Sequence, residues 1–233
     1  MGNEITILCT RPVNDGLIGE ALKNSIAIDV LSFIETEPIE TVEVQQEIEN
    51  AVILSATVVF TSMNAVEAVS LFIEEQKPAW KIYCIGNTTK QLVLKYFGED
   101  LLAGTADNAA ELAQLIVAES EGEDVIFFCG DQRRDELPAV LRQNDIEVNE
   151  IIVYETVAVP HKITKEYFGI LFFSPSAVES FFSVNKVTGQ TVLFAIGSTT
   201  AEAIKKFTTN TVIVSDMPGK DNLVEKVIEY FGG

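Results

Sequence analysis

A long pattern occurs twice in this chain. Residues 60–67 (FTSMNAVE) return as residues 172–179 (FFSPSAVE), and residues 85–89 (IGNTT) return as residues 196–200 (IGSTT). The two copies keep their order and nearly their spacing, which is typical of a duplicated unit that is too long for a solenoid repeat. Each copy joins an apolar run to a helix-like start, so the sequence predicts two related α/β domains.

A weaker copy indicates how the chain is threaded through these domains. Residues 5–36 resemble residues 125–156, because each segment opens with an apolar strand that ends in cysteine and closes on Glu-Thr. The domains could form in tandem, or the middle of the chain could form one domain and its two ends the other. We favour the second arrangement, because the β-branched stretches that close the two segments could then run side by side as the only crossings. The predicted boundaries are residues 1–36 with 158–233 for domain 1, residues 38–155 for domain 2, and hinge strands near 34–40 and 153–160.

Short apolar runs alternate with stretches of helical periodicity along the whole chain. The runs are continuous and rich in Val, Ile and Phe, as strands buried on both faces should be. The expected strands lie near residues 4–9, 29–36, 57–61, 81–85, 124–129, 148–157, 169–173, 191–196 and 211–214. This alternation predicts parallel sheets with helices on both faces, hence three-layer α/β domains. In such sheets, ligands bind beyond the carboxyl ends of the strands.

Composition restricts the partners of the chain. Of its 233 residues, 47% are hydrophobic, and the formal net charge is −19. The apolar content excludes a disordered chain, and the negative charge argues against nucleic acid or an anionic membrane, because both attract basic patches. No apolar run reaches the roughly 18 residues of a membrane span, and no signal-peptide pattern is visible. We therefore expect a cytoplasmic protein, and we also expect it to be a monomer.

The residues that several common chemistries require are missing. His161 is the only histidine, and Cys9, Cys84 and Cys129 are isolated inside apolar strands, where we interpret them as core residues. A Ser-His-Asp or Cys-His nucleophile and a histidine-built metal site are therefore not expected. The glycine motifs that bind phosphates and dinucleotides are also absent from the sequence. We expect a function without a metal and without a cofactor.

Polar residues mark the expected helix starts. Four stretches place a side-chain acceptor three residues before glutamate, the spacing of a capping box: residues 64–67, 108–111, 176–179 and 222–225. Threonines at 88, 89, 199 and 200 follow a glycine at a strand end, and they too could be caps. Free N–H groups and hydroxyls at such helix starts could also bind carboxylates, if the starts face one another across a cleft.

Five motifs, in this order along the chain, resemble those of uroporphyrinogen-III synthase. They are residues 60–62 followed by Ala-Val-Glu, residues 129–134 followed by Leu-Pro, and residues 153–156, 173–176 and 195–200. Each motif is weak alone, but five in sequence together with the duplication are specific, and the resemblance covers essentially the whole chain. The fold of that family, two α/β domains joined by a two-strand ladder, agrees with the threading favoured above.

The resemblance implies a lyase of tetrapyrrole and haem biosynthesis that uses no cofactor. Its substrate would be hydroxymethylbilane, a linear tetrapyrrole with eight carboxylates, and its products uroporphyrinogen III and water. Loss of the terminal hydroxyl gives an azafulvene, attack at the substituted carbon of ring D gives a spiro intermediate, and reclosure inverts that ring. Because the free bilane closes unaided without inversion, the main task of the enzyme would be to hold the chain in one geometry.

The resemblance also implies which residues meet the substrate. Tyr154 would donate a proton to the departing hydroxyl. Arg11 and Arg134 would face the substrate, whereas we interpret Arg133 as a solvated arginine. Hydroxyls and backbone donors would complete the binding site, at Ser62, Thr88, Ser174, Ser176, Thr199 and Thr200. They would carry more of the recognition than in relatives that have a lysine at the start of the strand before residues 195–197, where this chain has Thr-Val.

A second class of function stays open. Two α/β domains with two strand crossings also describe solute-binding proteins, which clamp anions by hinge closure. The chain could in that case bind an anion or a tetrapyrrole without turnover. Binding of the bilane without ring closure would separate this alternative from the synthase.

Overall fold

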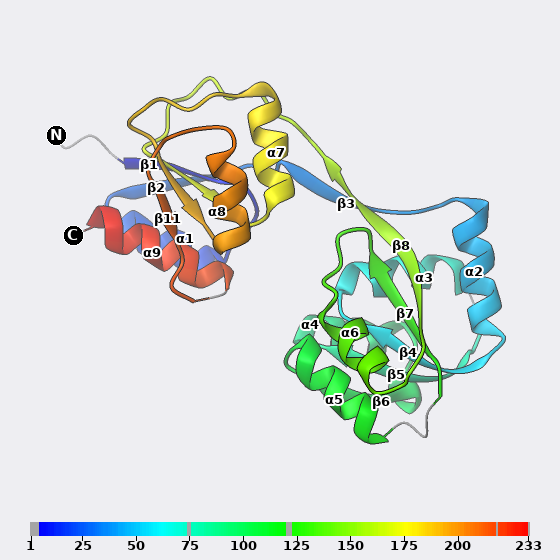
Figure 1. Ribbon diagram of the computed structural model, residues 1–233. Helices are drawn as coiled ribbons and strands as arrows, with labels where there is room; N and C mark the ends of the chain where they lie inside the picture. The colour runs from blue at the N-terminus through cyan, green and yellow to red at the C-terminus, as the bar shows by residue number, and fades with distance from the viewer. Residues whose placement is uncertain (1–4, 74–75, 120–122, 218, 233) are drawn as a thin grey trace. The chain divides into compact units, whose positions relative to one another are not determined.

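The computed structural model describes residues 5–73, 76–119, 123–217 and 219–232. The chain forms two compact units (Figure 1). Unit 1 combines residues 1–35 with 157–233, and unit 2 consists of residues 36–156. Unit 1 thus contains both ends of the chain. The ability of either unit to fold alone as a domain, with the boundaries given above, stays a prediction.

Unit 1 is built on a five-stranded sheet with the order β11-β10-β9-β1-β2. The strands are β1 (Ile5–Cys9), β2 (Ile26–Val30), β9 (Gly169–Phe172), β10 (Val192–Ala195) and β11 (Val212–Val214). All neighbouring pairs are parallel, and Cys9 at the end of β1 lies beside Val30 of β2 and Leu171 of β9. Strand β1 therefore comes from the N-terminal segment, and its neighbour β9, the middle strand of the sheet, from the C-terminal one.

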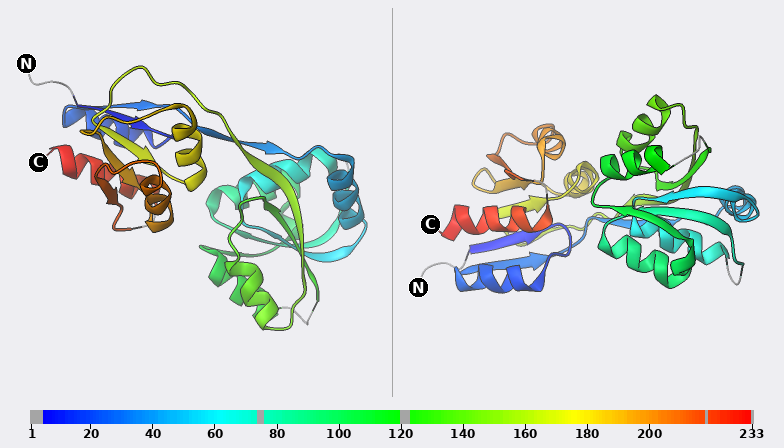
Figure 2. Two further views of the ribbon diagram at one scale, coloured as in Figure 1. Left: turned by 45° about the horizontal axis from the view of Figure 1, so that its top comes forward. Right: turned by 90° about the horizontal axis from the view of Figure 1, so that it is seen from below.

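Helices cover both faces of this sheet (Figure 2). They are α1 (Asp15–Lys23) and α9 (Lys220–Gly232) on one face, and α7 (Pro175–Val184) and α8 (Ser198–Lys205) on the other. Successive residues of β1 alternate between these layers, as strand geometry requires: Ile7 and Cys9 pack with α1 and α9, and Leu8 packs with α7 and α8. Both faces of the strand are buried, which explains its continuous apolar sequence.

Unit 2 carries a six-stranded sheet with the order β3-β8-β7-β4-β5-β6. The strands are β3 (Ile34–Pro38), β4 (Ser55–Phe60), β5 (Ala79–Ile85), β6 (Leu102–Ala106), β7 (Val125–Gly130) and β8 (Val148–Ala158). The pairs from β8 to β6 are parallel. Read from β6 to β8, this order repeats that of unit 1 from β11 to β2, so the sequence duplication is also a duplication of topology.

The sheet of unit 2 is likewise the middle of three layers. The helices α2 (Val42–Val52), α3 (Met63–Ile73) and α4 (Asn87–Tyr96) pack on one face, and α5 (Ala109–Glu119) and α6 (Glu136–Gln143) on the other. A short 3₁₀ helix, η1 (Glu99–Leu101), follows α4. On the first face, Trp80 and Phe128 pack together and the indole N–H donates to the Ala51 carbonyl at 2.9 Å, so the buried indole is satisfied.

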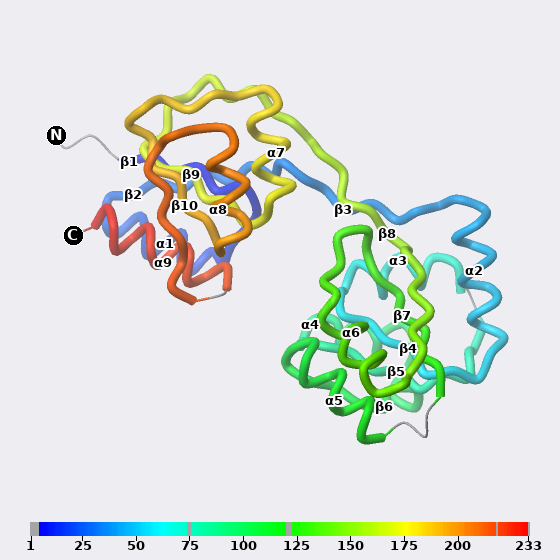
Figure 3. The backbone as a smooth tube through the Cα atoms, in the orientation of Figure 1, coloured from blue at the N-terminus to red at the C-terminus, as the bar shows by residue number. Residues whose placement is uncertain are grey.

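The chain crosses between the units in β3 and β8, which are neighbours in sheet order. Within unit 2, the amide of Ile39 donates to the Val153 carbonyl at 3.0 Å, and within unit 1 the amide of Val159 donates to the Phe33 carbonyl at 2.9 Å. The two strands can be followed in the backbone trace of Figure 3. Their use as hinge strands stays a prediction.

The predicted α/β class with parallel sheets in three layers is confirmed, one expected strand is divided in two, and one strand was not expected. The strand expected near residues 29–36 is divided into β2 and β3, because Phe33 between them turns into the core and is fully buried. The strand β6 was not predicted, because its sequence LAGTA contains a single β-branched residue. Its pairing with β5 holds it in place, which overrides the weak local preference.

The helix caps also differ from the capping boxes expected in the sequence. Asn108 acts as predicted, accepting from the amide of Glu111 at 2.9 Å. In α3 and α7 the acceptors are Ser62 and Ser174, two residues earlier than expected, because each helix begins earlier than the capping box predicts, at Met63 and Pro175. Asn222 lies inside α9. The threonines are not caps either: Gly86 and Gly197 take the cap positions of α4 and α8, without a side-chain bond.

Candidate active site

A cavity of about 340 Å³ opens at the carboxyl edge of the unit 2 sheet, the edge where parallel sheets bind ligands. It is formed by the end of β5, by the segments that follow β4, β6 and β7, and by Tyr154 from β8. Its lining comprises Thr61, Ser62, Ile85, Asp107, Asn108, Ala109, Phe127, Gly130, Arg133, Arg134, Glu136, Leu137 and Tyr154. Three of the predicted site residues, Ser62, Arg134 and Tyr154, are thus brought together.

Tyr154 is half-buried and packs against the core of unit 2 on the side of α2 and α3. Burial raises the pKa of its phenol above the ordinary value of 10.0. The charge of Asp131 acts in the same direction, and a hydrogen bond between the side chains of Tyr154 and Ser62 opposes it. The phenol is therefore protonated at neutral pH and can donate a hydrogen bond to an oxygen in the cavity.

Ser62 and Arg134 reach the cavity from the ends of two neighbouring strands, β4 and β7. The hydroxyl of Ser62 accepts from the amide of Asn64 at 3.2 Å and lies in the turn between β4 and α3. Arg134 is exposed, in the loop between β7 and α6. In the part of the chain that the structure describes, no carboxylate forms an ion pair with Arg134. Its charge is available to an anionic ligand.

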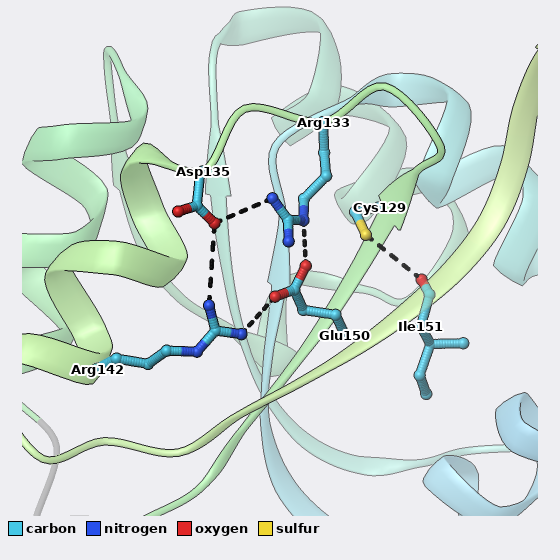
Figure 4. A network of polar contacts seen from close by, with 6 residues as sticks. All are labelled: Cys129, Arg133, Asp135, Arg142, Glu150 and Ile151. Carbon is cyan, nitrogen blue, oxygen red and sulfur yellow. Dashed lines mark hydrogen bonds and ion pairs between the residues drawn. The ribbon is translucent and has the colours of Figure 1, made fainter.

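Arg133 is not the solvated arginine that the sequence suggested. Its guanidinium lies between two carboxylates, bonded to Glu150 through Nε and to Asp135 at 3.1 Å, and its side chain is only 27% exposed (Figure 4). Arg142 completes the network by donating to the other oxygen of Glu150 at 2.5 Å. Glu150 lies early in β8, so the network ties the loop after β7 to that strand. The positive charge of Arg133 is used inside the protein.

Arg11 occupies the corresponding edge of unit 1. It follows β1 by two residues, is partly buried, and places its guanidinium carbon 5.9 Å from the centre of the Phe173 ring. Burial lowers the pKa of Arg11 from its ordinary value, although at neutral pH the group stays charged. Among the described residues no carboxylate pairs with it. A partly buried cation of this kind favours an anionic ligand.

Lys220 lies close enough to Arg11 to feel its charge, and no motif of the sequence indicated this. Burial and the positive charge of Arg11 lower the pKa of Lys220, and neighbouring Asp221 offsets the effect only in part. Lys220 is also the first residue of α9, whose N-terminus adds a partial positive charge. Two cations and a helix start therefore meet at this edge of unit 1. The sequence gives no sign that Lys220 lies near Arg11, because the two residues are at opposite ends of the chain. Only the three-dimensional structure shows it.

The remaining predicted residues lie at helix starts and differ in accessibility. Ser174 caps α7 by accepting from the amide of Ala177 at 3.2 Å, and Ser176 lies in the first turn of the same helix. Thr88 and Thr199 are exposed in the first turns of α4 and α8, but only 3% of the surface of Thr200 is exposed. Thr88 does not line the cavity of unit 2. Substrate contact by these hydroxyls stays a prediction.

The predicted role of the cysteines as core residues is confirmed. Cys9, Cys84 and Cys129 are free thiols with at most 1% of their surface exposed, and burial raises the pKa of each from 9.0 to about 11. Within residues 5–73, 76–119, 123–217 and 219–232, no group of three His, Cys, Asp or Glu side chains is placed to hold a metal ion. In the same ranges no helix is both long and apolar enough to cross a membrane.

Comparison with known proteins agrees with this architecture. The family model described as uroporphyrinogen-III synthase HemD matches residues 17–225, most of the chain. A crystal structure of uroporphyrinogen-III synthetase from Helicobacter pylori 26695 aligns with 97% of this chain and 99% of its own, at 15% identity and a TM-score of 0.66. A mutant uroporphyrinogen III synthase from the extremely thermophilic bacterium Thermus thermophilus aligns with 97% and 98%, at 12% identity and a TM-score of 0.54.

The two solved structures establish a shared fold, since their identity to this chain is too low to carry more. The family match rests on the sequence itself and spans both units, from α1 to α9. It includes the loops after β4, β7 and β10, and Tyr154 in β8. The chain belongs to the uroporphyrinogen-III synthase family.

Proposed function

We propose that this chain converts hydroxymethylbilane into uroporphyrinogen III and that Tyr154 protonates the hydroxyl group that leaves. One observation carries the proposal. In a chain of the synthase family, a half-buried phenol that is protonated at neutral pH lies at a cavity together with Ser62 and Arg134. The enzymes of this family are cyclising lyases, so a proton donor for water loss is the group that such a site needs.

Tyr154 is suited to this step by its position and its protonation state. Loss of hydroxide from the bilane is slow unless the oxygen receives a proton or a strong hydrogen bond as the bond breaks. The phenol can supply it, and Ser62, which bonds to the same phenol, can stabilise the negative charge that develops on it. The bond that breaks is the carbon–oxygen bond of the hydroxymethyl group, the electron pair leaves with oxygen, and water is the product.

The remaining task is to bind a polyanion in one shape. The substrate has eight carboxylates and the protein a net charge of −19, so recognition needs cations that are not already neutralised. Arg134 in unit 2 and Arg11 with Lys220 in unit 1 meet this condition, whereas Arg133 does not. We assign carboxylate binding to the first three. Ser174, Ser176, Thr88, Thr199 and Thr200 would add hydroxyls or backbone donors at helix starts.

The ratio of product isomers tests the proposal directly. Fresh hydroxymethylbilane closes without protein to the type I ring, so every assay contains its own reference reaction. The protein should shift the product to the type III ring, as measured by oxidising the products and separating the isomers by chromatography. A protein that binds the bilane but leaves the type I ring as the product would instead be the non-catalytic binding protein, which the family match does not favour.

Two further properties belong to the proposal. A cytoplasmic location is supported by three cysteines that are all free thiols, the state typical of a reducing compartment. Function as a monomer is supported by the cavity of unit 2, which one copy of the chain forms alone. Light scattering at micromolar concentration would test the second property, and fractionation of cells that produce the protein would test the first.

A further inference from the structure

Tyr154 is placed by a glycine that faces it across the sheet. The pairing of β7 with β8 is regular up to Cys129 and Ile152, and then one residue of β8 is skipped so that Gly130 lies beside Tyr154. A bulge of this kind bends a strand and gives its next side chain a new direction. The skipped residue is Val153, which is fully buried. The bulge therefore sets the direction of the phenol.

The ring of Tyr154 lies against the backbone of Gly130, in the space that a side chain there would fill. A Cβ atom on Gly130 would stand 2.4 Å from Cζ of the ring, 2.5 Å from Cε2 and 2.8 Å from the hydroxyl oxygen. Non-bonded carbon atoms do not approach so closely, and the ring is rigid, so even alanine at residue 130 would force the ring to another position. Glycine is thus required at residue 130 because it has no side chain and leaves space for the ring.

The next residue, Asp131, ties the same two strands together. The amide of Asp131 donates to the Tyr154 carbonyl at 3.1 Å, and the carboxylate of Asp131 accepts from the amide of Thr156 at 3.0 Å. Both bonds fix the backbone around Tyr154, one at the residue itself and one two residues later. Gly130 and Asp131 together therefore hold the ring and the strand that carries it.

We propose that Gly130 and Asp131 are positioning residues for the reaction: they do not touch the bond that breaks, but they fix the Tyr154 hydroxyl at the cavity. This inference rests on the proposed role of Tyr154 as proton donor. A donor acts only within hydrogen-bond distance of the oxygen, so a small displacement of the ring is sufficient to lose most of its effect.

The substitution Gly130→Ala is the sharpest test. We expect kcat to fall by about 10²-fold, as far as Tyr154→Phe lowers it, with little change in KM, because substrate binding depends on other groups. The double variant Gly130→Ala with Tyr154→Phe should be no slower than either single variant, since a displaced hydroxyl and a deleted one are equivalent. Multiplied losses in the double variant would overturn the proposal.

The chain contains a matched control. At a second bulge, between β5 and β6, Tyr83 lies beside Gly104, and a Cβ atom on Gly104 would meet the ring at 2.8 Å. The hydroxyl of Tyr83, however, donates to Glu119 at the end of α5 and does not line the cavity. Gly104→Ala should therefore lower stability by the same kind of clash and leave the activity of the folded protein unchanged. Equal losses of activity in both variants would show that the effect is one of stability alone.

A second readout follows the ring without any substrate. In protein labelled with ¹³C at the tyrosine Cζ atoms, the Tyr154 signal can be assigned by its absence from Tyr154→Phe and titrated with pH. Because burial raises the pKa of this phenol, Gly130→Ala should lower that pKa towards the ordinary value, and Gly104→Ala should leave it unchanged. A Tyr154 titration that Gly130→Ala does not alter would overturn the proposal even if activity fell.

The positioning role of Asp131 is tested by a separate pair of variants. These variants also test the proposal if Gly130→Ala does not fold. Asp131→Ala removes the acceptor for the Thr156 amide and should lower kcat by about tenfold, and Asp131→Asn, which keeps an oxygen acceptor, should restore it. Equal activity in the two variants would remove Asp131 from the proposal. If Tyr154→Phe proves fully active, Tyr154 is not the proton donor. The pH titration of the ¹³C signal of Tyr154 would in that case still show whether Gly130 fixes the position of the ring.

Discussion

The corresponding strands of the two units, β1 and β7, are alike up to a cysteine at or near their ends and differ after it. Strand β1 ends on the buried Cys9, and β7 carries the buried Cys129 one residue before its end. The next two residues are Thr10 and Arg11 in unit 1, where unit 2 has Gly130 and Asp131. The same spacing separates the two cysteines and the two Glu-Thr pairs that close the duplicated segments, so these positions correspond.

The difference has a clear structural consequence. Thr10 is fully buried, and its hydroxyl donates to the Leu171 carbonyl at 2.7 Å, so its side chain fills the space beside the neighbouring strand. Gly130 leaves the corresponding space empty, and the ring of Tyr154 takes it. We call the residues that follow the cysteine at the end of each of these strands the corner of the unit. The corner of unit 1 therefore presents a partly buried cation, Arg11, and the corner of unit 2 presents the phenol of Tyr154. From one duplicated corner, unit 1 derives a group for binding anions and unit 2 a group for chemistry.

The largest expected effect concerns the units themselves. If each unit combines one copy of each duplicated segment, residues 36–156 should fold alone. Residues 1–120 would lack three of the five strands of unit 1 and two of the six strands of unit 2, and should not fold. Thermal unfolding followed by circular dichroism would show a cooperative transition for the first fragment. A cooperative, soluble fragment of residues 1–120 would favour the tandem arrangement and remove the basis of the comparison between the corners.

Much of this fold could be predicted because the duplication repeats both corners and strands. Apolar strands buried on two faces leave an unmistakable sequence, as in VIFFC before Gly130. The misses have physical reasons. β6 has little strand preference of its own, and β2 ends early because Phe33 is drawn into the core. Local patterns do not report such tertiary effects.

The candidate site was less accessible to sequence reasoning. Tyr154, Ser62 and Arg134 were found through family motifs, and the structure places all three at one cavity. Lys220 was missed, because its proximity to Arg11 depends on pairing of the two ends of the chain. Contacts between distant segments are the part of a site that motif spacing cannot supply.

Removal of the phenol should have the largest effect on catalysis. Tyr154→Phe deletes the proton donor and keeps the ring that fills the space over Gly130, so we expect about 10²-fold slower turnover. The product that the enzyme still releases should remain type III, because the shape of the site is kept. Both isomers must be followed over time, since slow turnover leaves more bilane to uncatalysed closure. Full activity would assign the proton to another donor.

The cationic corner should affect binding and leave the isomer ratio unchanged. Arg11→Ala should weaken binding by about 1.5–3 kcal/mol, roughly ten- to a hundredfold, if it removes a charge-assisted pair with a carboxylate. Lys220→Ala should have a smaller effect in the same direction, because Lys220 shares the anion with Arg11. Lys226→Ala is the control from the same helix, since Lys226 is already paired with Asp216 and Glu229. Calorimetric titration with product would measure all three.

An equal weakening in the Lys226 variant would show that net charge, rather than this corner, governs affinity. No change in the Arg11 variant would mean that the substrate does not reach unit 1 at Arg11, and the division of roles between the corners would be wrong.

The two neighbouring arginines of unit 2 should separate stability from binding. Arg133→Ala leaves the carboxylate of Glu150, 17% exposed, without its Arg133 partner, so the urea midpoint should fall clearly. Arg134→Ala touches no ion pair in the described chain and should leave the midpoint within error, while it weakens product binding. Reversed results would exchange the roles assigned to these residues.

The smallest effect tests the one feature in which the corners agree. Burial raises the pKa of Cys9 and of Cys129 from 9.0 to about 11. Well below pH 9 both thiols are protonated in the folded and the unfolded chain, so they cause no pH dependence there. As the pH rises from 9 through 11, the unfolded chain loses these protons first, and stability falls.

Cys9→Ala and Cys129→Ala should each make this fall shallower, by equal amounts, in urea midpoints compared at neutral pH and near pH 10. Tyr83 and Tyr167, with pKa values raised from 10.0 to about 12, add to this fall from about pH 10 upwards, and they do so in the wild-type chain and in both variants alike. A fall that only one of the two variants moderates would show that the corners differ already at the cysteines, before Thr10 and Gly130 set them apart.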